Sequence, residues 1–178
     1  MRCFVAIPVP DHLRDALVSV QAHLPLGRPV ARENLHLTLA FLDEQPEDRL
    51  EELHAELDRV RAAAFTLSLS GLGCFGGDKP RLIFADVSPS PALEDVHRKI
   101  LGAARRAGIA LARRRFHPHV TLARIRPGSA GADRIAAAIS GLGDRPLPSM
   151  PVSSMSLFRS DLRPDGPIYD ELAHYDLI

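Results

Sequence analysis

Cysteine is scarce in this chain of 178 residues, which contains only Cys3 and Cys74. Each is followed directly by a phenylalanine, Phe4 or Phe75. Two isolated cysteines lack the ligand spacing of a zinc site, and apolar neighbours are typical of a buried thiol. We therefore expect two reduced, largely buried thiols rather than a disulfide or a metal site.

Long apolar runs are also absent. The first ten residues, with Arg2 near the start and Pro8 and Pro10 within the apolar stretch, are too short and interrupted for a signal peptide. No segment approaches the roughly 18 apolar residues that a membrane span requires. The sequence therefore predicts a cytoplasmic protein without a membrane partner.

An excess of either charge is missing as well, since the formal net charge is zero. A protein that coats long stretches of nucleic acid usually carries a strong positive charge, so any contact with RNA should be short and local. There is no Gly-x-Gly-x-x-Gly after an expected strand and no Gly-Lys-Ser/Thr loop, which argues against a dinucleotide or P-loop site.

The remaining pattern predicts an α+β fold in a single domain over residues 1–178. Apolar alternation and turn residues indicate strands, and apolar residues at helical spacing indicate helices between them. The expected strands often follow one another in pairs, which favours antiparallel sheets over a doubly wound parallel sheet. The expected strands are 2–9, 35–42, 65–72, 81–87, 116–125, 152–158 and 168–177; the expected helices are 10–24, 46–57, 88–108 and 130–141; and segments 25–32 and 146–151 are expected to be a loop and a linker.

Threonine is scarce too, and two of the three threonines belong to a repeated pentapeptide. His36-Leu37-Thr38-Leu39-Ala40 and His119-Val120-Thr121-Leu122-Ala123 lie 83 residues apart. In a strand, residues two apart point to the same face, so each histidine should lie beside its threonine. A chain with two such units can fold as two similar halves whose histidines face one another.

A facing pair of histidines suits the hydrolysis of a phosphodiester. One imidazole can take a proton from the attacking water while the other gives a proton to the leaving oxygen, and a pKa near 6.5 allows both protonation states. The hydroxyls of Thr38 and Thr121, with Arg124 or Arg126, can stabilise the phosphoryl oxygens without a metal. A strained 2′,3′-cyclic phosphate at an RNA end would suit such a site.

At the family level, the chain resembles the two-histidine (2H) phosphoesterases, and more closely the RNA 2′,3′-cyclic phosphodiesterases, also called 2′-5′ RNA ligases. The segments that carry the resemblance, in addition to the first pentapeptide, are Arg2-Cys3-Phe4-Val5-Ala6-Ile7, Phe116-His117-Pro118-His119-Val120-Thr121-Leu122-Ala123-Arg124, Leu157-Phe158-Arg159-Ser160-Asp161-Leu162 and Gly166-Pro167-Ile168-Tyr169.

This resemblance implies a bilobal fold with pseudo-twofold symmetry, in which each lobe is an antiparallel sheet backed by helices and a central groove holds the site. It implies that His36 protonates the leaving ribose O3′ and that His119 activates water, giving a 2′-phosphate. Thr38 and Thr121 would belong to the phosphate site, Arg124 would contact the phosphate, and Phe41 would stack on the terminal base. No metal or cofactor is implied, and we expect a monomer whose partner is an RNA 3′ end or nucleotide with a 2′,3′-cyclic phosphate.

Several alternatives stay open at this point. By strict alternation Phe41 points away from His36 and could be a core residue, unless a bulge intervenes. His117 is interpreted as a neighbour of the site, and His12, His54, His97 and His174 as solvated residues, while the run 113–115 is either a solvated loop or a guide for RNA. The same site could seal or cleave 2′-5′ linkages, or the chain could bind nucleotides or RNA without turnover.

Overall fold

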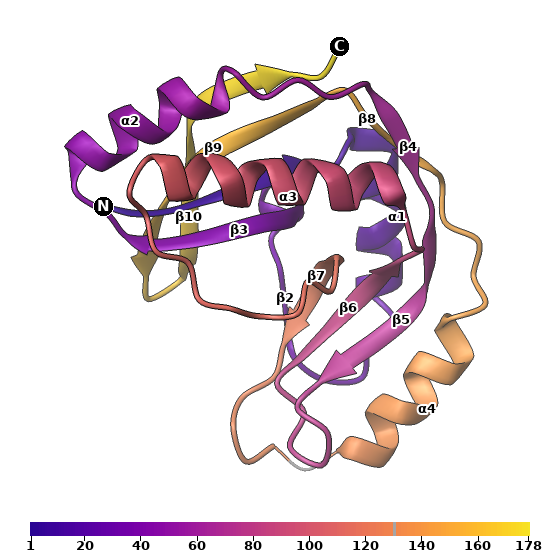
Figure 1. Ribbon diagram of the computed structural model, residues 1–178. Helices are drawn as coiled ribbons and strands as arrows, with labels where there is room; N and C mark the ends of the chain where they lie inside the picture. The colour runs from indigo at the N-terminus through magenta and orange to yellow at the C-terminus, as the bar shows by residue number, and fades with distance from the viewer. Residues whose placement is uncertain (130) are drawn as a thin grey trace.

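An antiparallel sheet forms the centre of the computed structural model, which describes residues 1–129 and 131–178 (Figure 1). Its strands run in the order β10-β9-β1-β3-β7-β6-β5, and β2 also pairs with β7, whereas β4 and β8 form a separate small sheet. The strands are β1 (Arg2–Pro8), β2 (Arg28–Pro29), β3 (His36–Glu44), β4 (Phe65–Leu67), β5 (Leu69–Phe75), β6 (Leu82–Val87), β7 (His119–Arg124), β8 (Met150–Val152), β9 (Ser154–Arg163) and β10 (Gly166–Asp176). The predicted α+β class with antiparallel sheets is therefore confirmed.

Each α-helix packs against an element other than the strand that it follows in sequence. They are α1 (Asp11–Gln21), the 3-10 helix η1 (Arg32–Asn34), α2 (Glu47–Leu57), α3 (Pro91–Arg106) and α4 (Ala132–Leu142). The Ser90 hydroxyl accepts a hydrogen bond from the Leu93 amide and Pro91 occupies the first turn, so the sequence itself fixes the start of α3. α1 packs against β7, α3 against β3 and α2, and α4 against β5 (Figure 1).

One face of the two motif strands belongs to the main hydrophobic core. Leu37 and Leu39 of β3 and Val120 and Leu122 of β7 are buried with the apolar stripes of α1 and α3. Because strand residues alternate between faces, the histidine and threonine of each motif lie on the opposite face, where they are partly buried. The core thus fixes which face of the sheet carries the polar groups.

The second motif strand begins at His119, three residues later than predicted. Pro118 has no N–H to donate to a strand partner, and the ring of Phe116 stacks on the imidazole of His97 in α3 with their centroids 3.8 Å apart. The expectation that His97 is a solvated residue is therefore wrong, since it is partly buried against Phe116.

Short strands also differ from the sequence prediction. The predicted loop 25–32 contains β2, the predicted linker 146–151 contains the start of β8, and the strand predicted over 65–72 is divided into β4 and β5. β2, β4 and β8 have only two or three residues, too few for an alternating pattern. They exist through the pairing of β2 with β7 and of β4 with β8, which is a tertiary effect. The helix predicted from residue 130 is observed from Ala132, and residue 130 lies outside the described residues.

The two cysteines lie as the sequence predicts. Cys3 is buried, Cys74 is partly buried, and both thiols are free. Within residues 1–129 and 131–178, no helix is both long enough and apolar enough to cross a membrane. The bilobal symmetry of the whole chain stays a prediction, although the two motif strands themselves are closely equivalent.

Candidate active site

The two repeated motifs meet in the middle of the sheet. β3 and β7 run antiparallel, and Leu37 pairs with Val120, so that each paired residue lies between the histidine and the threonine of its own motif. Alternation then directs His36, Thr38, His119 and Thr121 to one face of the sheet, where all four are partly buried. Two segments 83 residues apart in sequence therefore supply one continuous polar surface.

His36 is held by bonds to both of its ring nitrogens. Its Nδ1–H donates to the main-chain carbonyl of Asn34 at 2.6 Å, and its Nε2 accepts from the Thr38 hydroxyl at 3.0 Å. The rings of Phe4 and Tyr169 flank the imidazole with centroid distances of 4.9 and 5.2 Å. Because Nδ1 carries the proton, Nε2 is the nitrogen of neutral His36 that can accept one.

His119 repeats this arrangement in the second motif. Its Nδ1–H donates to the carbonyl of His117, again two residues earlier, at 2.7 Å. Two aromatic rings again flank the imidazole, those of Phe75 and Phe84, at centroid distances of 5.0 and 5.1 Å. In both motifs the main chain fixes the tautomer, and Nε2 is left for chemistry.

The surroundings of the two imidazoles disfavour their charged forms. Burial lowers the pKa of His36 to about 4, the Asn34 carbonyl raises it, and the charges of Arg124 and His119 lower it. Burial also lowers the pKa of His119, though less far, and the charge of Arg124 again lowers it. Since one guanidinium acts on both rings, and one imidazole on the other, the three groups form a single electrostatic cluster.

A β-bulge in each motif strand turns one further residue toward this cluster. Val5 pairs with Ala40 and Ala6 with Thr38, so Leu39 has no partner on β1. Leu122 is left without a partner on β6 in the same way. The extra residue reverses the alternation, which brings Phe41 and Arg124, each five residues after its histidine, to the face of the histidines.

The bulge in β3 determines where the side chain of Phe41 lies. Its side chain is 59% exposed, so the alternative in which it is a core residue is wrong. Its ring lies 6.3 Å from the ring of Phe4, which in turn contacts His36. Arg124 is exposed at the equivalent position of the second motif, so the two halves present an aromatic ring and a cation, respectively, beside their histidines.

Two helix side chains whose role the sequence did not predict hold the bulged residues. The imidazole Nδ1–H of His97 donates to the carbonyl of Leu39 at 2.9 Å, and the amide of Gln21 donates to the carbonyl of Leu122 at 2.8 Å. A bulge leaves backbone groups without a ladder partner. His97 supplies a partner for the Leu39 carbonyl, whereas the Leu122 carbonyl accepts from Gln21 and also from the main-chain amide of Val30 at 2.8 Å. The only sequence signal would have been a polar residue on the apolar side of each helix.

Comparison with known proteins agrees with this geometry. Residues 9–164 match the 2′-5′ RNA ligase superfamily, which is most of the chain. The chain belongs to this superfamily. An RNA 2′,3′-cyclic phosphodiesterase of Thermus thermophilus is 34% identical over 188 residues, covering 99% of this chain and 90% of the relative. One of Aeropyrum pernix is 33% identical and covers 90% of each chain.

Solved structures of the superfamily share the fold. LigT of Escherichia coli in its apo form superposes with a TM-score of 0.82 at 30% identity, covering 99% of this chain and 96% of LigT. The complex of the same protein with 3′-AMP gives the same TM-score and identity and covers 97% of LigT. The architecture described above is therefore the LigT-like form of the superfamily.

His117 lies next to the cluster and has a partner of its own. Its Nε2 lies 3.0 Å from a carboxylate oxygen of Asp86, and its main-chain carbonyl orients His119. It is thus a neighbour of the site, as predicted, through its backbone. Arg126 follows the end of β7 and is exposed, as are the three arginines of the run 113–115.

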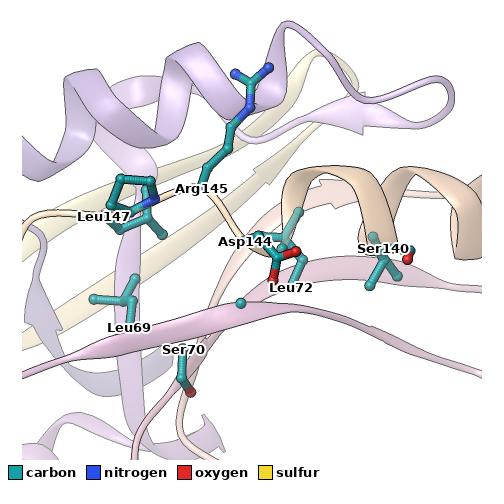
Figure 2. Close-up of a pocket in the computed structure, with 11 residues that line it drawn as sticks. Leu69, Ser70, Leu72, Ser140, Asp144, Arg145 and Leu147 are labelled. Atoms are coloured by element: carbon teal, nitrogen blue, oxygen red, sulfur yellow. The ribbon is translucent and has the colours of Figure 1, made fainter.

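Cavities elsewhere in this superfamily member do not include the histidines. One of about 650 Å³ lies between β5 and the end of α4 (Figure 2). Another of about 400 Å³ lies between the end of α2 and α3. No group of three or more His, Cys, Asp and Glu side chains in the described part of the chain is arranged to hold a metal ion. The polar cluster on β3 and β7 is the candidate site with proton-transfer groups.

Proposed function

We propose that this chain is an RNA 2′,3′-cyclic phosphodiesterase that opens the cyclic phosphate at an RNA 3′ end to a 2′-phosphate. The observation that carries the proposal is the pairing of Leu37 with Val120, which sets two histidine-threonine units and Arg124 on one face of the sheet. The names of the superfamily relatives support the substrate class. The 3′-AMP complex of LigT supports a site that accepts a nucleotide with its phosphate.

His36 acts as the general acid on the leaving ribose O3′, and His119 acts as the general base on the attacking water. Each transfer is typically worth about a hundredfold to ten-thousandfold in rate. An imidazolium with a lower pKa is the stronger acid, and the imidazole with the higher pKa is the stronger base. The deeper pKa depression at His36 supports this division of roles.

This assignment requires the proton to sit on the imidazole with the lower pKa, which is the less populated state of the free protein. An anionic substrate between the two rings favours their charged forms, because an opposite charge within about 4 to 6 Å raises the pKa of an imidazole. Substrate binding thus supplies part of the proton affinity that burial removes at His36. The charge of the bound phosphate and the active protonation state are therefore coupled.

The phosphoryl oxygens are held by Thr38, Thr121 and Arg124. In the free protein the Thr38 hydroxyl donates to Nε2 of His36. When Nε2 gains a proton it becomes the donor, and the hydroxyl can then donate to a phosphate oxygen. The guanidinium of Arg124 supplies the positive charge for the transition state, so the reaction as proposed proceeds without a metal or cofactor.

Phe41 stacks on the terminal base, which its exposed ring beside Phe4, itself a neighbour of His36, supports. Base stacking on an aromatic ring is worth about 1 to 3 kcal/mol and does not depend on base identity. All proposed site residues come from one chain, so residues 1–178 act as one catalytic domain and a monomer suffices.

A second candidate function is the joining or cleavage of 2′-5′ linkages at the same site. The superfamily description names a 2′-5′ RNA ligase, and this favours the candidate. The same acid and base can run the transfer in reverse, with a ribose hydroxyl in place of water. The two reactions differ in the nucleophile and not in the residues that serve it.

The test is to incubate the protein with a short RNA bearing a 2′,3′-cyclic phosphate and to identify the product by phosphorus NMR. We expect a 2′-monophosphate, formed equally well in the presence of EDTA. A 3′-monophosphate would contradict the acid and base assignment, inhibition by EDTA would contradict metal independence, and binding without product would indicate a non-catalytic module. A second RNA with a free 5′-hydroxyl, added to the mixture, reveals ligation as a longer product.

His36→Ala and His119→Ala should each lower the turnover by at least about a hundredfold. The matched control is His23→Ala, because His23 is an exposed histidine whose Nδ1–H donates only to the carbonyl of Ser19 within its own helical segment. A normal rate in either motif variant would remove the role assigned to that residue.

A further inference from the structure

Two arginines face one another beside the candidate site. Arg28 of β2 pairs with Arg124 of β7 across the antiparallel ladder, and β2 lies next to β7 (Figure 1). Directly opposite residues point to the same face with Cβ atoms about 4.5 to 5.5 Å apart. Arg28 therefore shares the face of Arg124 and of the two histidines.

This pair carries charge that the protein does not neutralise. Like charges at opposite positions of a ladder are destabilising. Among residues 1–129 and 131–178, other arginines form ion pairs, whereas Arg28 and Arg124 form none. An anion bound on this face would relieve the repulsion, which is the arrangement expected of a phosphate site.

Carbonyl groups fix the direction of the Arg28 side chain without cancelling its charge. Its guanidinium donates to the main-chain carbonyls of Pro164, at 3.5 Å, and Asp165, in the turn between β9 and β10. A guanidinium has five N–H donors, so others stay free for a ligand. The side chain of Arg28 thus extends from β2, next to β7, to the turn between β9 and β10.

The same hairpin is tied to the catalytic histidine. The side-chain amide of Asn34 donates to the carbonyl of Pro167 at 2.8 Å, and the main-chain carbonyl of Asn34 accepts from His36. Gly166, with φ +123°, provides the backbone conformation that this turn needs. Arg28 and His36 are therefore bound to one hairpin, and the position of one guanidinium is set relative to the catalytic ring.

Arg28 lies farther from the reacting centre than Arg124. The charge of Arg124 lowers the pKa of both His36 and His119, whereas Arg28 contributes to neither. Its guanidinium is drawn toward the hairpin turn instead. Two cations at neighbouring positions, one at the histidines and one beyond them, match two successive phosphates of a nucleic-acid strand.

We propose that Arg28 binds the phosphodiester on the 5′ side of the terminal nucleotide, so that the chain prefers oligonucleotide ends over mononucleotide cyclic phosphates. This inference rests on the function proposed above, with Arg124 at the cyclic phosphate and Phe41 at the terminal base. It adds a specificity residue from a two-residue strand outside both motifs.

The test compares adenosine 2′,3′-cyclic phosphate with the diadenylate that ends in the same group. The measured quantity is the ratio of kcat/KM for the dinucleotide to kcat/KM for the mononucleotide. We expect the wild-type ratio to exceed one and Arg28→Gln to lower it about tenfold, mainly through KM of the dinucleotide, because a charge-assisted phosphate contact is lost. Arg28→Lys should restore part of the ratio, since the charge is kept.

The matched control is Arg134→Gln, which removes an exposed arginine of α4 and should leave the ratio as in the wild type. An unchanged ratio in Arg28→Gln overturns the inference. The ratio also stays unchanged if the substitution only loosens the hairpin or weakens the cyclic phosphate contact, because kcat/KM then falls equally for both substrates. Failure of the wild-type protein to open either cyclic phosphate would instead contradict the proposed function itself.

Discussion

Acidification should destabilise the folded protein through His36. The pKa of His36 is about 4 in the folded state, against an ordinary value of 6.5. The unfolded chain therefore binds a proton more readily, and the contribution of His36 to stability is lost as the pH falls from about 6.5 toward about 4. At about 1.36 kcal/mol for each pKa unit, the loss between about pH 8 and about pH 5 amounts to about 2 kcal/mol.

Urea unfolding of the wild type and His36→Gln at these two pH values measures this contribution. Other titrating groups affect both proteins alike, so the wild type should lose about 2 kcal/mol more of its free energy of unfolding than the variant does. His23→Gln, which changes an exposed histidine, should behave as the wild type. Equal losses in the wild type and His36→Gln would refute the argument that burial holds His36 neutral.

Three further predictions concern catalysis and binding. Because the pKa values of His36 and His119 are both lowered, kcat/KM for the cyclic phosphate should fall with increasing pH above about 6.5. A plateau up to about pH 8 would contradict the requirement for one protonated imidazole. Arg124→Gln should lower kcat/KM by about a hundredfold and Arg124→Lys by less, as stopped assays would show; equal loss would mean that the charge is unimportant. Phe41→Ala should raise KM by about tenfold with little change in kcat or thermal stability, since the ring is exposed, and an unchanged KM would rule out stacking.

The face that carries the candidate site could be predicted from the sequence because it depends on a local rule. Residues two apart in a strand share a face, so each histidine-threonine unit was predictable from its spacing alone. The meeting of the two units depends on the pairing of β3 with β7, which composition does not encode. The repeat made this pairing a reasonable prediction, and the resemblance to a family supplied the rest.

The orientation of Phe41 could not be settled from alternation. The bulge at Leu39 arises from the register between β3 and β1, and the His97 imidazole that supports it belongs to α3. Both are contacts between distant segments. Phe41 is therefore exposed and not a core residue, and His97 is partly buried and not solvated as expected.

The small strand β2 could not be predicted from a sequence pattern. Arg28 and Pro29 lie in a segment with proline and glycine, where no alternation is possible over two residues. They form a strand through their pairing with Arg124 and Ala123 of β7. The opposition of two arginines, on which the inference about Arg28 depends, is thus visible only in the folded chain.

We propose that His36 and His119 act on one phosphate, and NMR of their ring nitrogens can show whether both rings contact the same ligand. Adenosine 2′-phosphate, the expected product, would be titrated into protein labelled with nitrogen-15 in histidine. We expect the Nε2 signals of both rings to move with the same dissociation constant and both pKa values to rise. A response from one ring alone, or two different dissociation constants, would contradict this proposal.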